Sequence, residues 1–171
     1  MIKKITLLCF FFILWNQIGN SQETPSYYIE NKSSFLDIRL GTAVSEISKD
    51  RIEDFPFTLK DENKKLYYFL DTKKQRVAII HSILKDQEIV SCIELATTNF
   101  STEHGFNIGT TFEDIIKKFS PHEFKIRNNN TYGVIIRIDK LNYILDFPSD
   151  NDTVSIDEIP LTSMVISVRI Q

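Results

Sequence analysis

The feature that most constrains the fold of this chain is an internal repeat. The segment IRLGTAVSEI, which begins at Ile38, aligns with FNIGTTFEDI, which begins at Phe106, an offset of 68 residues. The same offset aligns residues 66–71 with residues 134–139 without a gap. Self-similarity at a fixed offset indicates that one supersecondary unit is built twice. We therefore expect a pair of similar units in one chain.

Each copy contains a Gly-Thr pair before an apolar segment, which is typical of a helix start. Thr42 and Thr110 are suitable N-caps, because a hydroxyl oxygen can accept a hydrogen bond from a backbone amide that has no partner within the helix. In the second copy Thr110 and Glu113 fit a capping box. Apolar residues then follow at helical spacing up to Phe119. The first helix has the weaker pattern, and Pro56 sets its outer limit.

Strands are expected after each helix. The candidates are residues 65–71, 76–84 and 88–95 in the first copy, and 132–139, 140–147 and 163–170 in the second. Polar and apolar residues alternate in several of them, which predicts a sheet with one covered face and one wet face. The sequence therefore predicts an α+β fold. Two tandem copies of a helix followed by about three antiparallel strands are expected, with the helices covering one face of the sheet.

The start of the chain has the layout of a secretory signal peptide. Two lysines precede the uncharged, largely apolar stretch Ile5–Trp15, and the segment ends with small residues at Gly19 and Ser21. The apolar stretch is shorter than the roughly 20 residues that span a bilayer. We therefore expect cleavage near Ser21 and a mature protein that is periplasmic or secreted, without a stable membrane anchor.

The signal peptide and the repeat divide the chain into four parts. These are the signal peptide 1–21, a polar lead segment 22–34, a first α+β repeat 35–100 and a second α+β repeat 101–171. An acidic segment, residues 148–160, is expected to be a surface loop within the second repeat.

The charge of the chain argues against two classes of partner. Its 20 Lys and Arg against 23 Asp and Glu give a formal net charge of −3, and the charges are scattered. Nucleic-acid binding requires clustered Lys and Arg that displace counterions, so we expect no nucleic-acid partner. A polybasic membrane patch is excluded in the same way.

The sequence offers no pattern of a catalytic or metal centre. Cys92 lies in an apolar strand, where a small buried side chain is expected. His81 lies on an apolar strand, and His104 and His122 flank the second helix at opposite ends, too far apart to share a metal. H-x-x-x-H, C-x-x-C and G-x-S-x-G patterns are missing. We expect no catalytic activity, no cofactor and no metal.

The order of the expected elements resembles a known fold. A Gly-Thr turn, a short helix with an acid before its apolar residues, and three antiparallel strands occur twice, which is similar to the beta-lactamase inhibitor protein fold. The envelope-assembly lipoproteins of the small-protein-A type look like single copies of a related module. Residues 40–42 with 46–47, and 108–110 with 114–115, carry this resemblance. It implies an exported, non-catalytic module that binds another protein, often through the open face of the sheet. The chain departs from both groups, because it lacks the paired cysteines often seen in the inhibitor and the lipid-attachment cysteine of the lipoproteins.

A run of aromatic residues suggests where a partner binds. Tyr67, Tyr68 and Phe69 place rings on both faces of one strand. The residue that the repeat aligns with Phe69 is Arg137, which is expected to point to solvent. By that correspondence Tyr67, Phe69 and Arg137 form the candidate partner-binding surface, since exposed aromatic residues beside arginine are typical of binding surfaces. The alternative is that the lead segment or the acidic loop covers them.

These observations favour non-enzymatic binding of a partner protein outside the cytoplasm, as an inhibitor-like or envelope-associated protein. Two alternatives remain. A carrier of an apolar small molecule would need a closed apolar pocket of several hundred Å³. A hydrolase with an unrecognised carboxylate site would need converging ionisable groups with shifted pKa values. Asp71 and Asp139 recur at equivalent strand ends, where turn-forming aspartates are expected.

Overall fold

The computed structural model describes residues 27–29, 33–57, 59–121, 123–129, 133–149 and 153–171. The predicted signal peptide, residues 1–21, lies outside the described residues, as do residues 22–26 and 30–32 of the predicted lead segment. Within the ranges above, every helix is too short or too polar to cross a membrane.

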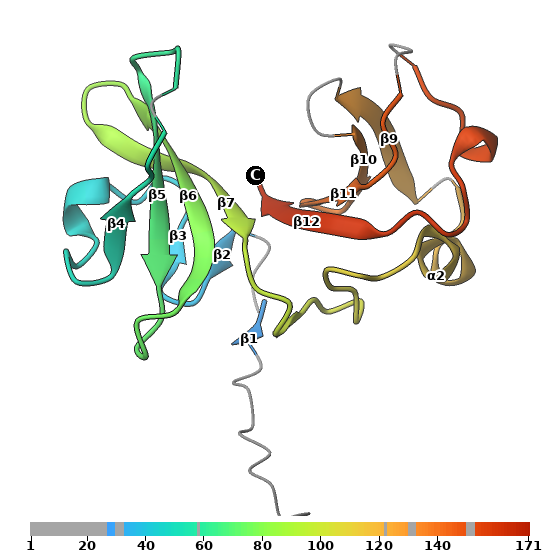
Figure 1. Cartoon of the computed structure of the whole chain (residues 1–171), viewed down its shortest axis with the longest axis horizontal. Helices are drawn as coiled ribbons and strands as arrows, with labels where there is room; N and C mark the ends of the chain where they lie inside the picture. The colour runs from blue at the N-terminus through green and yellow to red at the C-terminus, as the bar shows by residue number, and fades with distance from the viewer. Residues whose placement is uncertain (1–26, 30–32, 58, 122, 130–132, 150–152) are drawn as a thin grey trace, which may run out of the picture.

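Strands are the main regular elements of the described residues, and the helical segments are short (Figure 1). The strands are β1 Tyr27–Tyr28, β2 Ser34–Phe35, β3 Ile38–Arg39, β4 Ile52–Asp54, β5 Lys64–Leu70, β6 Arg76–Leu84, β7 Glu88–Leu95, β8 Phe100–Ser101, β9 Phe124–Asn129, β10 Gly133–Ile138, β11 Leu141–Leu145 and β12 Val165–Ile170. The helical segments are the 3-10 turns η1 Val44–Glu46 and η2 Ile156–Glu158, and the α-helix α2 Phe112–Lys118.

Eight of these strands form one antiparallel sheet in the order β4-β5-β6-β7-β12-β11-β10-β9. Strands β4 to β7 form one half and β9 to β12 the other, and Figure 1 shows the halves as two lobes that meet where β7 joins β12. At this junction Ile93 lies opposite Ile170, Glu94 opposite Arg169, and Leu95 opposite Val168. A short strand contact therefore holds the two lobes in one sheet.

One face of the sheet forms the hydrophobic core. A continuous row across six strands consists of Phe69, Ala78, Leu95, Val168, Tyr143 and Ile136, and each of these residues is at most 2% exposed. Phe35 and Ile38 of the β2–β3 hairpin, Val44 of η1, and Phe112 of α2 belong to the same buried cluster. Each fully buried large apolar side chain stabilises the fold by about 1.5–3 kcal/mol. The small elements outside the sheet therefore cover this core face.

The predicted fold class is wrong. The described residues contain one α-helix and a large antiparallel sheet, not two copies of a helix and about three strands with the helices covering the sheet. The first predicted helix is only the turn η1, because Ala43 stands at its N-cap and offers no side-chain hydrogen bond. So short a segment cannot repay the cost of helix nucleation. Ile52–Asp54, which follows it, instead joins the edge of the sheet as β4.

The second predicted helix is present, with a different cap. The hydroxyl of Thr111 accepts a hydrogen bond from the Asp114 amide, and the Asp114 carboxylate accepts one from the Thr111 amide. Thr110, which we expected at this position, instead bonds through its hydroxyl with Asn107. The capping box is therefore one residue later than predicted, with Asp114 in the place expected for Glu113.

The aligned Gly-Thr pairs have equivalent surroundings in the two halves. The Gly41 amide donates to the Val90 carbonyl, and the Gly109 amide donates to the Val165 carbonyl. Both glycines have a positive φ, of 85° and 93°, which a residue with a Cβ rarely adopts. Each Gly-Thr pair therefore forms a turn that is hydrogen-bonded to the last strand of its half, which is β7 in the first half and β12 in the second.

Part of the predicted lead segment belongs to the fold. Strand β1 pairs in parallel with β8, and Ile29 is 4% exposed. The Tyr27 hydroxyl donates to the Asp71 carboxylate over 2.6 Å. Burial and this hydrogen bond raise the pKa of Tyr27 to about 12, so the phenol stays protonated. Asp71 also accepts from the Lys73 and Gln75 amides, which is the turn-forming role predicted for it.

Candidate functional site

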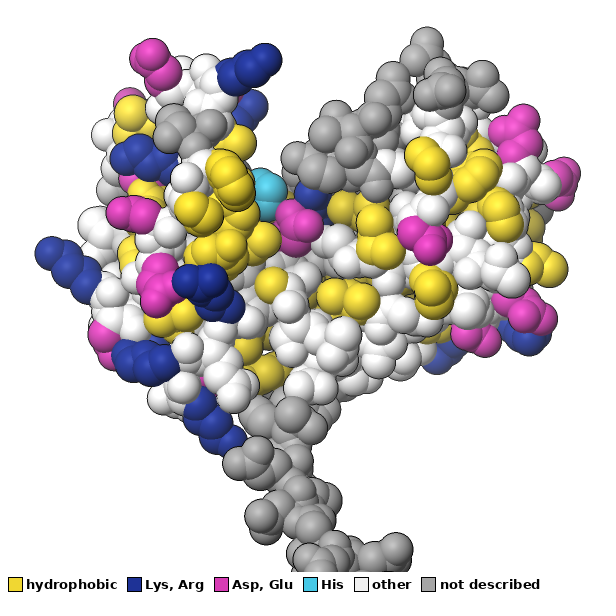
Figure 2. Space-filling view, in the orientation of Figure 1, with side chains coloured by type: hydrophobic (Ala, Val, Ile, Leu, Met, Phe, Trp, Pro, Cys, Tyr) yellow, Lys and Arg dark blue, Asp and Glu magenta, His cyan; other side chains and the backbone are white. Residues whose placement is uncertain are grey.

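The second face of the sheet lines the space between the two lobes. Figure 2 shows this space as a hollow, with hydrophobic side chains on the inner side of the β4–β7 lobe and a histidine and an acid at its base. One row of cross-strand neighbours spans all eight strands on this face: Glu53, Tyr68, Ile79, Glu94, Arg169, Asn142, Arg137 and Lys125. We call this surface the concave face.

The β4–β7 side of the concave face is aromatic and aliphatic. The rings of Phe55 and Tyr68 have centroids 4.7 Å apart, and those of Phe55 and Phe57 are 6.0 Å apart. Leu66 and Ile79 flank them, because side chains opposite one another on neighbouring strands share a face. Phe57 is 72% exposed. These five residues are the aromatic wall.

Charged side chains hold the aromatic wall in place. The Arg76 guanidinium lies 4.1 Å from the centroid of the Tyr68 ring, which is a cation–π contact. The same guanidinium pairs with Glu53 over 3.0 Å. The Tyr68 ring is therefore fixed between Arg76 and Phe55, and little of its freedom remains to be lost when a partner binds.

The base of the hollow is an ionic network on three strands, which we call the ionic floor: His81, Glu94, Ser167 and Arg169. Glu94 accepts from Arg169 over 2.8 and 2.9 Å and from Ser167 over 2.8 Å, and it lies 2.9 Å from the His81 Nε2. Its side chain is only 18% exposed. Burial alone would raise the pKa of Glu94, but the contacts with His81, Arg169 and Ser167 outweigh it and lower the pKa to about 2. The carboxylate is therefore ionised and oriented before any partner arrives.

Cys92 lies opposite His81 at the edge of this floor. It is 4% exposed, in agreement with the expected buried position. Burial raises the pKa of its thiol to about 12. A thiolate is the nucleophilic form of cysteine, so the raised pKa and the burial of Cys92 do not favour a nucleophilic role.

Two adjoining hollows open on the concave side of the β4–β7 lobe. One, of about 270 Å³, is lined by Phe55, Phe57 and Leu66 among others, and the second, of about 240 Å³, by His81 and Arg169 among others. Leu59, Lys64 and Lys65 line both. Both hollows include charged walls and open to solvent, so neither has the form of the closed apolar pocket that a carrier needs.

The structure does not bring the three predicted site residues together. Tyr67 and Phe69 are 8% and 1% exposed and lie on the core face, so their expected place on the open face is wrong. Arg137 lies on the concave face opposite Asn142, as expected. The repeat alignment only counts residues along the chain, whereas the face on which a side chain lies depends on how the strands pair. A shift of one residue in that pairing moves every side chain of the strand to the opposite face. The two halves also differ in the connection that precedes the aligned strands. It has nine residues, 55–63, between β4 and β5, and three residues, 130–132, between β9 and β10.

The residues of the aromatic wall and the ionic floor were missed for different reasons. Every residue of the Leu66–Leu70 segment is apolar, so alternation does not reveal which ring faces the core. Glu94 had a usable signal, because an acid in the apolar strand Glu88–Leu95 requires a partner. The partner, Arg169, is separated from it by 75 residues, and only the sheet order brings them together.

In the part of the chain that the structure describes, one group of side chains could hold a metal ion. Ligand atoms of Glu103, His104 and Asp139 all lie within 4.8 Å of one another. The expected separation of His104 from His122 stays a prediction, because His122 lies outside the described residues.

No protein-family model matches the chain, and neither a curated protein nor a solved structure matches it. The resemblance to the inhibitor fold therefore stays a prediction, and the functional case depends on the geometry of the concave face.

Proposed function

We propose that this protein is an exported, non-enzymatic binding module, and that its partner is another protein seated in the hollow between the lobes. One observation carries this proposal: a preformed aromatic wall stands beside a preformed ionic floor on the same concave face. Tyrosine and arginine are enriched in binding hot spots, and phenylalanine is enriched at protein interfaces.

The chemistry of the two sides indicates what the partner presents. Phe55, Phe57 and Tyr68 offer apolar area on one side. On the other side, the row continues through Arg137 to Lys125, both positively charged. A protruding segment with an apolar side chain flanked by acidic residues would match both sides, because complementary charges fix register and speed association.

The wall and the floor are already ordered before binding. Side chains that must be immobilised cost about 0.5–1.5 kcal/mol each on association. Tyr68 is held by Phe55 and Arg76, and Arg169 by Glu94, so this cost is reduced at the centre of the face.

The proposal is tested by affinity capture with the tagged mature chain, residues 22–171, from the envelope and culture fluid of its own host. The double variant Phe55→Ala/Tyr68→Ala removes the centre of the wall. Leu161→Ala is the matched control, because Leu161 is 50% exposed and its carbonyl accepts from the amide of Glu113 in α2, in the other lobe.

We expect one protein to be retained by the wild type and by Leu161→Ala, and its affinity to fall at least about tenfold in the double variant. Circular dichroism and thermal unfolding establish that all three proteins are folded. Equal retention by the wild type and the double variant, or no specific protein retained by either, would contradict the proposal.

A further inference from the structure

Away from the concave face, two carboxylates lie close to the Nε2 atom of His104. These three groups are potential metal ligands. The His104 Nε2 lies 3.2 Å from the Asp139 Oδ2 and 3.3 Å from the Glu103 Oε1. Glu103 and His104 belong to the loop between β8 and α2, whereas Asp139 belongs to the tight β10–β11 turn. Two segments that are distant in the sequence therefore supply one cluster.

Two of the three distances between these ligand atoms match those of a small cation site, and all three are within 4.8 Å. Zinc lies about 2.0–2.2 Å from nitrogen and carboxylate ligands, so neighbouring ligands of a tetrahedral site are roughly 3.4 Å apart. Both distances from the His104 Nε2 are close to that value. An ion at the centre would replace the single hydrogen that this nitrogen can share between two carboxylates.

The imidazole is held in position by its surroundings. Its ring packs edge-on against Phe119, with centroids 4.9 Å apart, and it lies 6.3 Å from the Phe106 ring. The His104 backbone carbonyl accepts from the Lys118 Nζ over 2.6 Å. The His104 side chain is 16% exposed, whereas Glu103 and Asp139 are 42% and 45% exposed. Solvent therefore reaches the carboxylates while the ring stays fixed.

Two cationic side chains near the cluster donate to its backbone carbonyl oxygens. Lys118 donates to the His104 carbonyl, and the Arg137 Nε donates to the Asp139 carbonyl over 3.3 Å. Asp139 has a φ of 55° in its turn, a conformation that Asp and Asn tolerate better than other side chains. Its carboxylate is thereby aimed at His104.

We propose that Glu103, His104 and Asp139 bind one first-row divalent cation of the Zn²⁺ type, with water completing its coordination. One imidazole and two carboxylates favour such a borderline ion over Ca²⁺ and Mg²⁺, which take oxygen ligands. The bound ion would tie the β8–α2 loop to the β10–β11 turn. The sequence predicted no metal, because His104 and His122 are expected to be far apart and H-x-x-x-H and C-x-x-C patterns are missing.

The test is calorimetric titration of the untagged mature chain with ZnCl₂ alone, together with NMR of the histidine rings. His104→Gln removes the nitrogen ligand. Asp139→Asn removes a charged ligand and keeps the left-handed turn, so it distinguishes loss of the site from loss of the fold. Asp61→Asn is the matched control, because it makes the same change at a carboxylate that pairs with Lys64 in the other lobe.

We expect one Zn²⁺ bound with micromolar affinity and a shift of the His104 ring resonances. Binding should be lost in His104→Gln, weakened at least tenfold in Asp139→Asn and unchanged in Asp61→Asn, and millimolar Ca²⁺ or Mg²⁺ should not compete. No binding at millimolar Zn²⁺, or equal binding by the wild type and the Asp139→Asn and His104→Gln variants, would overturn the proposal. Neither outcome affects the test of the concave face.

Discussion

At the scale of single residues, Glu94 shows how one buried charge is made tolerable. Its carboxylate makes four polar contacts with His81, Ser167 and Arg169. Without them, burial would favour the neutral carboxylic acid. Arg169 is itself only 11% exposed, so each partner of this pair requires the other. Removing one partner of a buried pair leaves an uncompensated charge, which is costly.

We therefore predict that Glu94→Gln lowers the free energy of unfolding by about 2–4 kcal/mol at pH 7. The folded pKa of about 2 lies below the ordinary value of 4.5, so the carboxylate stabilises the wild type at higher pH. That stability is lost as the pH falls from 4.5 towards 2, and the variant should lose this part of its pH dependence. Urea unfolding of the wild type and Glu94→Gln between pH 7 and pH 2.5 measures both the loss of stability at pH 7 and the change in its pH dependence. Glu53→Gln, at a more exposed pair, should change stability by less than about 0.5 kcal/mol.

Two neighbouring aromatic residues have opposite roles because they face opposite sides of β5. Phe69 is 1% exposed and packs in the core, whereas Tyr68 lies on the concave face. We predict that Phe69→Ala costs about 3–5 kcal/mol of stability and Tyr68→Ala about 1 kcal/mol or less. Denaturant unfolding of both variants checks this. A similar loss in both would mean that the two faces of β5 are assigned incorrectly.

At the scale of elements, Gly133 fixes the approach of β10 to the end of β11. It has a φ of 102°, and a Cβ at this position would lie 2.4 Å from the Leu145 carbonyl oxygen. Gly41 has a φ of 85°, but a Cβ there would meet nothing within 4 Å. The two glycines therefore share the left-handed backbone and differ in the available space.

We predict that Gly41→Ala costs about 1 kcal/mol, the strain of the left-handed conformation alone. Gly133→Ala should cost at least about 2 kcal/mol more, because the backbone of β10 or β11 must also move. Thermal unfolding of the two variants compares them directly. Equal costs would show that the strands near Gly133 adapt without strain.

The sequence allows some elements to be predicted and leaves others undetermined. Alternation of polar and apolar residues located β11 and β12, whereas the start of β6 is apolar on both faces. It could not show which face of β5 is buried, since both faces are apolar. It did not indicate β4, which has three residues and lies at an edge. A helix was predicted over η1 because the apolar spacing was right, although the cap was missing.

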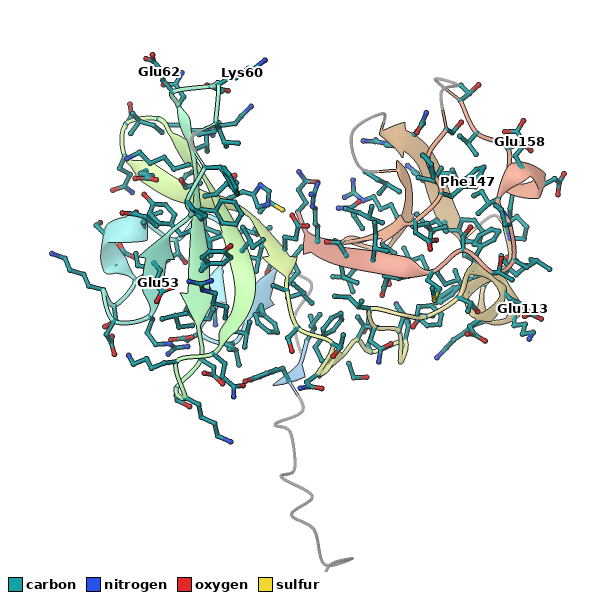
Figure 3. All side chains as sticks on the ribbon, in the orientation of Figure 1. Glu53, Lys60, Glu62, Glu113, Phe147 and Glu158 are labelled. Atoms are coloured by element: carbon teal, nitrogen blue, oxygen red, sulfur yellow. The ribbon has the colours of Figure 1, made fainter. Side chains whose placement is uncertain are left out.

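At the scale of the whole molecule, the sheet itself creates the candidate site. The lobes are joined where β7 pairs with β12, and the middle pair of that junction is Glu94 with Arg169. The same ion pair is therefore part of the fold and of the floor of the hollow. Figure 3 shows side chains of both lobes pointing into the space between them. No local pattern in the sequence could place Glu94 and Arg169 together, because their proximity depends on the order of strands from both halves.

The concave face as a protein-binding surface is the central claim, and site-specific photo-crosslinking tests it most directly. A photoreactive phenylalanine analogue at position 68 keeps an aromatic ring in the wall, and the same analogue at position 161 reports on the outer side of the other lobe. Each purified protein is added to envelope extract and culture fluid of the host and irradiated. We predict one discrete cross-linked protein from position 68, competed away by unlabelled wild type, and none from position 161. Equal cross-linking from both positions, or none from position 68, would contradict the account.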